Sequence, residues 1–299
     1  MLSGSDFPES QSRSGVLGPA TKKGTTPSRP ETLAEPELSD GRHLGTAIRL
    51  DRVSKVYGRG PAAVQALDRV SLEVGFGEFV CIVGASGCGK STLLSLIAGL
   101  ESPTAGTIEV RVRTALMFQD PALFPWLTVR QNVELPLKLQ RIRREHRADV
   151  VKALLEMVHL KGFENHRPHE LSGGMRQRAA LARALAQHGE ALLMDEPFAA
   201  LDAITRDALH EEIEQLWEET GFTVVFVTHN VREAVRLGDR VVVMSSRPGR
   251  IVEDIKVDLD RPRKIESPEV ATLASKIMEV LHAQVRLHGA GRSSLSAKK

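Results

Sequence analysis

The chain has 299 residues, enough for one large domain or two small ones, and its 40 Lys and Arg against 38 Asp and Glu leave a formal charge of +2. A balance so close to neutral excludes an electrostatic nucleic-acid binder and a disordered acidic chain, so we expect no nucleic-acid partner. The two cysteines, Cys81 and Cys88, form neither a disulfide framework nor a paired set of zinc ligands, and no run reaches the roughly 18 apolar residues of a spanning helix.

The first 45 residues differ in composition from the rest. Ser, Gly, Pro, Thr and charged residues dominate residues 1–45, and apolar residues such as Leu17 and Leu33 recur without a period. Such a segment cannot offset its ordering entropy by burial, so we predict a disordered N-terminal extension, with a docked regulatory segment as the alternative. Its start has no basic end followed by an apolar run, so we expect no export signal.

Strand patterns begin after this extension. Short β-branched and apolar runs predict strands over 47–56, 70–74 and 79–83, and the last of them ends at Gly84, as a buried parallel strand does when it opens into a loop. Residues 92–100 then have helical spacing. The order is therefore a strand, a glycine loop and a helix.

The middle third of the chain is predicted to be mainly helical. Apolar spacing indicates helices over 128–139, 143–158 and 174–186, which form an inserted helical subdomain over about 120–188.

Strand patterns return in the last third, over 191–194, 223–227 and 240–244, with a helix predicted over 205–220. Strands that alternate with helices imply a mostly parallel sheet covered on both faces. A further amphipathic pattern predicts a helical tail over 261–299.

A phosphate-binding motif follows the strand over 79–83. The sequence Gly84-Ala85-Ser86-Gly87-Cys88-Gly89-Lys90-Ser91 fits G-x-x-x-x-G-K-[ST] at every fixed position. Backbone N–H groups and the following helix N-terminus would bind phosphate oxygens. Lys90 would neutralise the β- and γ-phosphates and the Ser91 hydroxyl would ligate Mg²⁺, whereas an ordinary glycine-rich turn is the alternative.

Two carboxylates end the apolar strand over 191–194. Asp195 is placed to hold Mg²⁺ through its water shell, and Glu196 can orient or deprotonate the water that attacks a γ-phosphate. A solvated strand end is the alternative.

A third motif, Leu171-Ser172-Gly173-Gly174-Met175-Arg176-Gln177-Arg178, places a Ser-Gly-Gly turn at a helix start. With these three motifs in this order, the sequence over roughly 48–259 strongly resembles the ATP-binding subunits of ABC transporters. The resemblance implies an α/β fold, with a P-loop NTPase (RecA-like) core, a mostly parallel sheet, an antiparallel β edge and the inserted helical subdomain, in a domain over 46–260.

The resemblance also implies roles for four residues outside the three motifs. Tyr57 matches the aromatic residue that stacks on adenine, and Gln119 matches the glutamine that approaches Mg²⁺ and the attacking water. Asp202 matches an aspartate that signals across a dimer, and His229 matches the switch histidine that contacts the γ-phosphate. Taken alone, Tyr57 and His229 would be read as structural residues, Gln119 as an ordinary polar residue at a strand end, and Asp202 as a helix cap.

The implied cofactors are ATP and Mg²⁺. The expected catalytic residues are Glu196, His229, Gln119 and Lys90; the expected nucleotide-binding residues are Tyr57, Gly84, Ala85, Ser86, Gly87, Cys88, Gly89, Lys90, Ser91, Thr92, Ser172, Gly173, Gly174 and Asp202; the expected metal ligands are Ser91, Gln119 and Asp195.

In the family, the Ser-Gly-Gly turn lies far from its own phosphate loop, so the resemblance implies a head-to-tail dimer with a second copy of the chain. A second resemblance, over 124–129, 198–202 and 245–251, is to the nitrate, sulfonate and taurine importer subfamily. It implies transmembrane permease subunits, a periplasmic solute-binding protein in the same complex, and a peripheral position on the cytoplasmic face of the inner membrane.

Two other classes stay open. A soluble non-transport ABC ATPase would share all three motifs, and a P-loop kinase or GTPase would share the phosphate loop. The segment 107–118 is shorter than in most relatives, so we expect an antiparallel edge with strands over 108–112 and 115–118 that are joined without the usual turn residues. Cys88 is either a small filler residue or a thiol that ionises readily beside a helix start.

Overall fold

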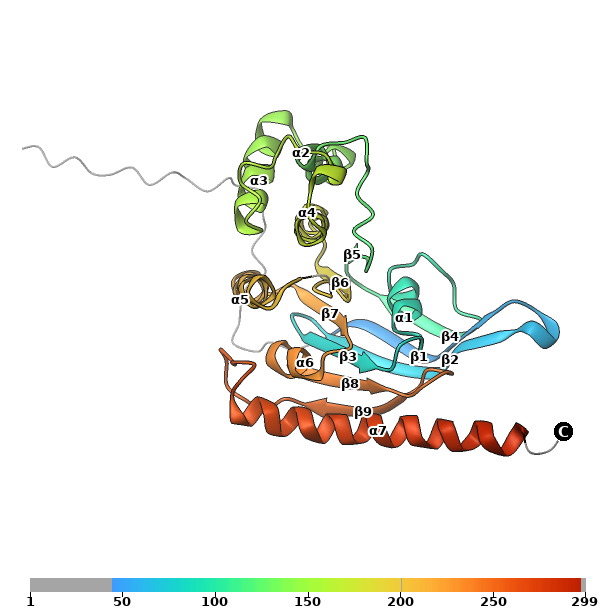
Figure 1. Cartoon of the computed structure of the whole chain (residues 1–299). Helices are drawn as coiled ribbons and strands as arrows, with labels where there is room; N and C mark the ends of the chain where they lie inside the picture. Colours follow the sequence, from blue (N-terminus) through green and yellow to red (C-terminus); the bar gives the residue numbers. More distant parts are fainter. Residues whose placement is uncertain (1–44, 200, 297–299) are drawn as a thin grey trace, which may run out of the picture. The chain divides into compact units, whose positions relative to one another are not determined.

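The computed structural model describes residues 45–199 and 201–296, so the predicted extension over 1–45 lies outside the described residues except for its last position. A six-stranded sheet is central to this part of the chain (Figure 1). Its strands, in spatial order, are β5 (Thr114–Met117), β6 (Ala191–Asp195), β7 (Thr223–Thr228), β3 (Phe79–Gly84), β8 (Arg240–Met244) and β9 (Ile251–Lys256). The first five run parallel and β9 runs antiparallel to β8, which confirms the mostly parallel sheet.

Strand β3 shows why this sheet is buried on both faces. Phe79, Cys81 and Val83 belong to one hydrophobic core, whereas Val80 and Ile82 belong to another. Successive side chains of a strand point to opposite faces, so a continuous apolar run fills both cores. The phosphate-binding motif therefore begins at the end of a strand that is held from both sides.

A three-stranded antiparallel sheet covers one face of the central sheet. It consists of β2 (Val64–Gly75), β1 (Thr46–Tyr57) and β4 (Ala105–Val110), in that spatial order, and it shares a hydrophobic core with helix α1 (Lys90–Ile97) and one face of β3.

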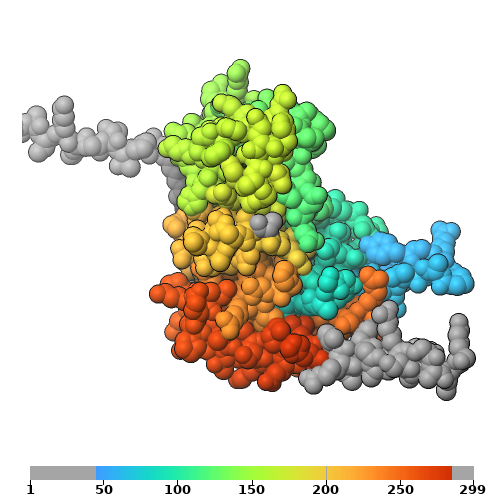
Figure 2. All heavy atoms as spheres, viewed as in Figure 1, coloured from blue at the N-terminus to red at the C-terminus, as the bar shows by residue number. Residues whose placement is uncertain are grey.

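Besides α1, the described part contains six further α-helices. Helices α2 (Val129–Leu139), α3 (Arg144–Met157) and α4 (Gly173–Leu185) form a helical lobe beyond the β5 edge of the central sheet, where α4 contacts β5 (Figure 1). Helices α5 (Ala203–Thr220), α6 (Val231–Leu237) and α7 (Pro268–Ser296) lie along the central sheet (Figure 1). Figure 2 shows the lobe in yellow-green and α7 in red on opposite sides of the orange segments between them. Within the described ranges, no helix has both the length and the apolar character needed to cross a bilayer.

The segment 107–118 folds differently from the expected antiparallel edge. Strand β4 joins the three-stranded sheet beside β1, whereas β5 joins the central sheet beside β6. The short connection crosses between the two sheets, with the Arg111 N–H bonded to the Ala47 carbonyl and the Arg113 N–H bonded to the Glu190 carboxylate. The two strands need no turn residues between them because they do not pair with each other.

Three features of the fold differ from the prediction. Strand β2 begins at Val64 rather than at residue 70, and neither α6 nor β9 was predicted. Strand β9 carries Glu253, Asp254 and Lys256 and is mostly exposed or half-buried, so it lacks the apolar run that marks the other strands of its sheet.

Candidate functional site

The predicted catalytic residues follow neighbouring strands at one edge of the central sheet. Gln119 comes after β5, Glu196 after β6 and His229 after β7, while the phosphate loop (residues 84–91) follows β3. These four strands are adjacent and parallel, so their carboxyl ends meet at the same edge. Ligands of open α/β sheets bind in the crevice outside the carboxyl ends of the strands. The structure thus brings residues that are far apart in the sequence to one place.

The phosphate loop has the conformation that its glycines allow. Gly87 and Gly89 have φ of 72° and 107°, in the left-handed region that favours glycine. A Cβ on Gly89 would lie 2.7 Å from Leu67 Cδ2 and 2.9 Å from the Ala66 oxygen, so no larger residue fits there. The loop closes against β2 and opens directly into the N-terminus of α1, an arrangement that favours an anion.

Lys90 lies across this loop. Its side chain is buried and its Nζ donates hydrogen bonds to the carbonyl oxygens of Gly84 at 2.9 Å and Ala85 at 3.2 Å. The ammonium is therefore held at the loop rather than extended into solvent, which is where a phosphate-neutralising cation has to be.

Two carboxylates lie beside the loop at the end of β6. Burial raises the pKa of the Asp195 carboxyl, and repulsion by Glu196 adds to the rise, whereas a hydrogen bond from the Ser91 hydroxyl and the charge of Lys90 oppose it. Glu196 has a left-handed φ of 46°, and its N–H donates to the Val227 oxygen at 2.9 Å. A non-glycine residue in this conformation is uncommon outside turns and functional sites.

Glu196 and His229 contact each other. The His229 Nδ1 atom lies 3.1 Å from the Glu196 Oε2 atom, and the His229 side chain is 65% exposed. His229 follows the last residue of β7 and precedes Asn230, the N-cap of α6. Its main chain is thus fixed on both sides, while the imidazole faces the open edge of the sheet.

Tyr57 lies at the end of β1, and the residue is 38% exposed. Its hydroxyl is 2.9 and 2.8 Å from the two carboxylate oxygens of Glu101, and Lys55 Nζ is 2.8 Å from the same carboxylate and 5.0 Å from the ring centroid. Burial and the hydrogen bond to Glu101 raise the pKa of the Tyr57 hydroxyl, and a hydrogen bond with Thr92 lowers it. The ring is thus fixed beside helix α1, close to the loop that precedes this helix.

Two further predicted residues cap helices. Ser172 is the N-cap of α4 and accepts a hydrogen bond from the Met175 N–H at 3.2 Å, and Asp202 is the N-cap of α5 and accepts one from the Thr205 N–H at 3.0 Å. The Thr205 N–H also lowers the pKa of the Asp202 carboxyl. Ser172 belongs to the helical lobe, whereas the phosphate loop belongs to the sheets (Figure 1).

One neighbour of the phosphate loop was not predicted as part of the site. The segment 245–250, here called the brace loop, lies against the back of the phosphate loop, where Arg247 Nε donates to the Gly87 oxygen at 3.3 Å. Gly249 exchanges backbone hydrogen bonds with β2, to the Ala66 oxygen at 2.8 Å and from the Asp68 N–H at 2.9 Å. The motif Arg-Pro-Gly-Arg was visible in the sequence, but nothing in its pattern indicated this contact.

Cys88 belongs to the phosphate loop and is almost fully buried, in the hydrophobic core beneath this loop. Burial raises the pKa of the Cys88 thiol. The charge of Lys90 and hydrogen bonds from two backbone N–H groups lower this pKa, but their effect is smaller than that of burial. The geometry therefore favours the filler role over that of a readily ionised thiol.

A glycine-rich loop between a buried parallel strand and a helix, with an acidic strand end beside it, defines a P-loop nucleoside triphosphatase. A family model described as ABC transporter matches residues 67–199. An uncharacterised ABC transporter ATP-binding protein of Methanocaldococcus jannaschii is 44% identical over 257 residues, which cover 83% of this chain and 96% of that protein.

Named importer subunits are similarly related. The nitrate import ATP-binding protein of Synechocystis is 45% identical over 77% of this chain and 88% of its own length. The taurine import ATP-binding protein of Burkholderia pseudomallei is 47% identical over 70% of this chain and 84% of its own length. A solved dimeric ATP-binding cassette in a post-hydrolysis state, bound to ADP and Pi, is 36% identical with a TM-score of 0.66, over 71% of this chain and all of that one.

The chain belongs to the ABC transporter family, as its motifs predicted, and it has the P-loop fold of that family. Members of this family bind and hydrolyse ATP, so the protein is an ATPase. Because the chain belongs to this family, it is not a P-loop kinase or GTPase, which was the second alternative.

Proposed function

We propose that the protein is the ATP-hydrolysing subunit of an importer that takes up a small anionic solute, of the nitrate, sulfonate or taurine type, through a separate permease. The observation that carries the proposal is the meeting of Gln119, Glu196, His229 and the phosphate loop at the ends of adjacent strands. The solute class is supported by the relatives named for nitrate, aliphatic sulfonate and taurine import. These names also favour import over a soluble non-transport ATPase.

Each residue at this edge has a defined task in hydrolysis. Phosphoryl transfer depends mainly on positioning and on stabilisation of developing charge. The loop N–H groups and Lys90 hold the phosphates, Glu196 orients the attacking water or accepts its proton, and His229 contacts the γ-phosphate from the neighbouring strand. The contact between His229 and Glu196 keeps both side chains at the same place.

The residues beside the loop suit Mg²⁺. Ser91 and Asp195 offer a hydroxyl and a carboxylate that already contact each other, and Gln119 offers an amide oxygen from the next strand. Mg²⁺ prefers such oxygen ligands and needs only one or two from the protein beside those of the phosphates. Burial disfavours the charged form of Asp195, and a cation at this position would stabilise it. When bound, the ion would neutralise phosphate charge.

We propose a head-to-tail dimer in which Ser172, Gly173 and Gly174 of one copy close the phosphate loop of the other. Ser172 is exposed at the N-terminus of α4, where the helix presents unpaired N–H groups to an anion. The dimeric state of the solved cassette bound to ADP and Pi supports this arrangement. Asp202 lies at the N-terminus of α5 and would face the same interface.

An exposed aromatic patch is the proposed permease contact. Phe124 and Trp126 are 37% and 67% exposed, and their rings lie 5.5 Å apart. On the same segment Phe118, directly before Gln119, is 44% exposed, so a partner bound to this segment would sense the nucleotide site. Aromatic side chains gathered on a surface are typical of protein interfaces. Through the permease the protein would lie peripherally on the cytoplasmic face of the membrane, in a complex with a periplasmic solute-binding protein.

We assign the ATP-binding domain to 46–260, with the helical subdomain at about 120–188, and the tail to 261–299. The three helices of the lobe fall between residues 129 and 185, and α7 falls within the tail. This division separates the ATPase core from the segment that follows β9.

The test is an ATPase assay of the purified chain beside Lys90→Ala, followed by capture of the tagged chain from membranes. We expect hydrolysis by the parent, none by the variant because the loop loses its fixed cation, and co-purification of a permease. Hydrolysis by Lys90→Ala at the parent rate would overturn the site. An active ATPase that captures no integral membrane protein would overturn the importer role alone.

A further inference from the structure

A buried polar cluster lies behind the segment that carries His229. His210 on α5 is 0% exposed, and Glu233 and Arg236 on α6 are 4% and 5% exposed. The His210 Nε2 atom is 2.6 Å from Glu233 Oε1, and its Nδ1 atom is 2.9 Å from Arg236 Nη1. Buried side chains of this kind are costly unless every polar atom has a partner, so their presence requires an explanation.

The hydrogen-bond roles in this cluster can be assigned from chemistry alone. A guanidinium only donates, so Nδ1 of His210 must be the acceptor and carries no proton. A carboxylate only accepts, so Nε2 carries the proton and donates it to Glu233. His210 is therefore the neutral Nε2–H tautomer. Asp207 and Glu211, 3.7 and 3.9 Å from the Arg236 guanidinium, add to the negative charge around it.

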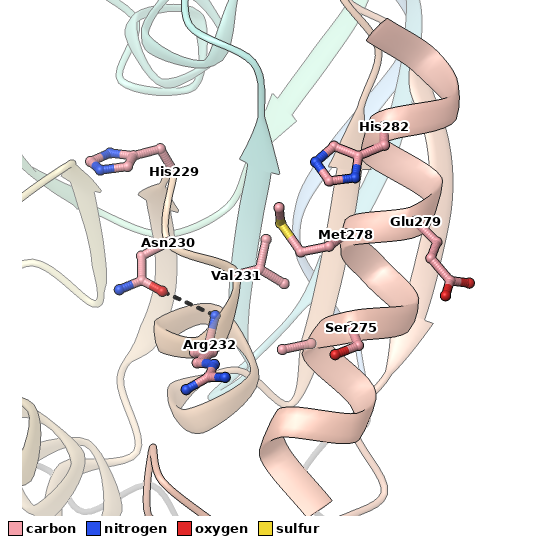
Figure 3. A pocket seen from close by; sticks show the side chains of 9 residues that line it. His229, Asn230, Val231, Arg232, Ser275, Met278, Glu279 and His282 are labelled. Carbon is pink, nitrogen blue, oxygen red and sulfur yellow. Dashed lines mark hydrogen bonds between the residues drawn. The ribbon is translucent and has the colours of Figure 1, made fainter. Parts of the chain in front are cut away.

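The cluster continues to both neighbours of His229. The Thr228 hydroxyl donates to Glu233 Oε2, and the same hydroxyl oxygen accepts from the Asn230 N–H at 3.0 Å. The Asn230 Oδ1 atom accepts from the Arg232 N–H at 3.1 Å (Figure 3). It also accepts from the Glu233 N–H at 3.3 Å. His229 itself donates nothing to the cluster, but the residues before and after it are bound to Glu233.

His210 also contacts the segment that follows Glu196. Its ring meets that of Phe198 edge to face, with centroids 5.0 Å apart, and Phe198 lies two residues after Glu196. Helix α5, which carries His210, begins at the cap Asp202. One buried imidazole is thus linked to Glu196 through Phe198 and to the neighbours of His229 through Glu233.

We propose that His210 is a positioning residue for ATP hydrolysis. It holds residues 228–230, which include His229, at a fixed position relative to the segment that follows Glu196. The inference rests on the proposed roles of Glu196 and His229. A polar cluster gives less stability than an apolar core would, but it fixes one arrangement because each donor fits one acceptor. Two segments that act on one phosphate need such a fixed arrangement, because small misplacements of catalytic groups are costly.

The first test compares His210→Leu with His210→Gln. Gln can offer one N–H donor and one acceptor oxygen, as the neutral imidazole does, whereas Leu offers neither. We expect His210→Leu to lower kcat about 10- to 100-fold with little change in KM for ATP, as for a displaced catalytic group, and His210→Gln to restore most of the loss. The control is Ile213→Val, a buried position on the same helix, which should lower Tm and leave kcat unchanged.

The second test is a double-mutant cycle with Thr228→Val, which removes the hydroxyl between Glu233 and Asn230. If the cluster acts as one chain of hydrogen bonds, the double variant loses no more kcat than the worse single variant. Thr228→Ser keeps the hydroxyl and should keep the rate. Additive losses would show that the two residues act separately and would overturn the proposal.

The third test is the ¹⁵N NMR spectrum of His210 in the full chain, assigned by comparison with His210→Gln. We expect the Nε2–H tautomer at pH 7; a protonated or Nδ1–H ring would contradict the assigned roles. Equal kcat for His210→Leu and Ile213→Val at matched Tm would also overturn the inference. Parent ATPase activity and its loss in His229→Ala are measured beside these variants, so failure of the proposed function is seen separately.

Discussion

The His229 Nδ1 atom lies 3.1 Å from Glu196 Oε2, although the two residues are 33 positions apart in the chain. The contact joins the ends of two neighbouring parallel strands, β6 and β7. The Glu196 side chain is 18% exposed and the His229 side chain is 65% exposed, so the acid is the more enclosed member and the imidazole the more accessible one. This suits a carboxylate that works on a confined water and a histidine that reaches a ligand.

Glu196→Gln should separate binding from hydrolysis. Glutamine keeps the shape of the side chain but cannot accept a proton, so we expect the hydrolysis rate to fall about 100-fold or more while ATP affinity stays. ATP should then trap a dimer, visible by size-exclusion chromatography. Glu219→Gln, at the exposed end of α5, is the control and should behave as the parent. Parent-rate hydrolysis by Glu196→Gln would show that Glu196 does not act on the water.

Gly249→Ala tests the brace loop. A Cβ at this position would collide with the Cys88 oxygen and lie 2.8 Å from Met244 Cε, so the brace loop and the phosphate loop would have to separate. We expect a loss of about 1–3 kcal/mol in the free energy of unfolding, together with a higher Kd for ATP.

The control for Gly249→Ala is Gly162→Ala in the helical lobe. There φ is 89° and nothing lies within 4 Å of an added Cβ, so alanine is strained without a clash. It should lower stability and leave nucleotide affinity unchanged. If both variants bind ATP as the parent does, the brace loop has no part in positioning the phosphate loop.

The sequence predicted those parts of the site that depend on local patterns. The phosphate loop follows from fixed glycine spacing, and Asp195 and Glu196 follow from the abrupt end of an apolar strand. Their proximity follows from parallel strands, because such strands place their carboxyl ends at one edge. The resemblance to a family supplied Tyr57, Gln119, Asp202 and His229, which no local pattern would single out.

The contacts that support the site could not be predicted. Glu101 holds Tyr57 across 44 positions, and Arg247 reaches Gly87 across 160. His210 lies on a helix whose pattern gives no sign that a buried carboxylate faces it. These contacts depend on tertiary packing, and single polar residues carry no period from which a partner could be inferred.

Glu101→Gln should weaken ATP binding without affecting the chemical step. The Glu101 carboxylate accepts hydrogen bonds from the Lys55 ammonium and the Tyr57 hydroxyl, and these two hydrogen bonds lower its pKa. Gln loses the ion pair with Lys55, so the predicted adenine-stacking ring is less well held. We expect the Kd for ATP to rise about 3- to 10-fold, because binding must then immobilise a side chain that Glu101 holds in place in the parent. Glu109→Gln on exposed β4 is the control, and an unchanged Kd in both variants would contradict this role of Glu101.

Asp195→Asn should stabilise the nucleotide-free protein while abolishing hydrolysis. Because burial raises the pKa of the Asp195 carboxyl, the folded state binds a proton more readily than the unfolded state does. The free energy of unfolding of the parent therefore falls as the pH rises from the pKa of Asp195 in the unfolded chain through its raised pKa in the folded protein. At pH 7 the parent carries the full cost of burying the charged carboxylate.

Asparagine has no charge to bury, so we expect a gain on the order of 1 kcal/mol at pH 7, which shrinks as the pH falls and the parent carboxyl becomes protonated. Thermal or urea unfolding of both proteins between pH 4 and pH 8, about the range in which carboxyl groups titrate, measures the difference. A gain that grows toward low pH would have the wrong sign and would show that Asp195 is stabilised, not penalised, in its charged form. Retained hydrolysis by Asp195→Asn, with a rate that depends on Mg²⁺ as in the parent, would remove Asp195 from the proposed metal site.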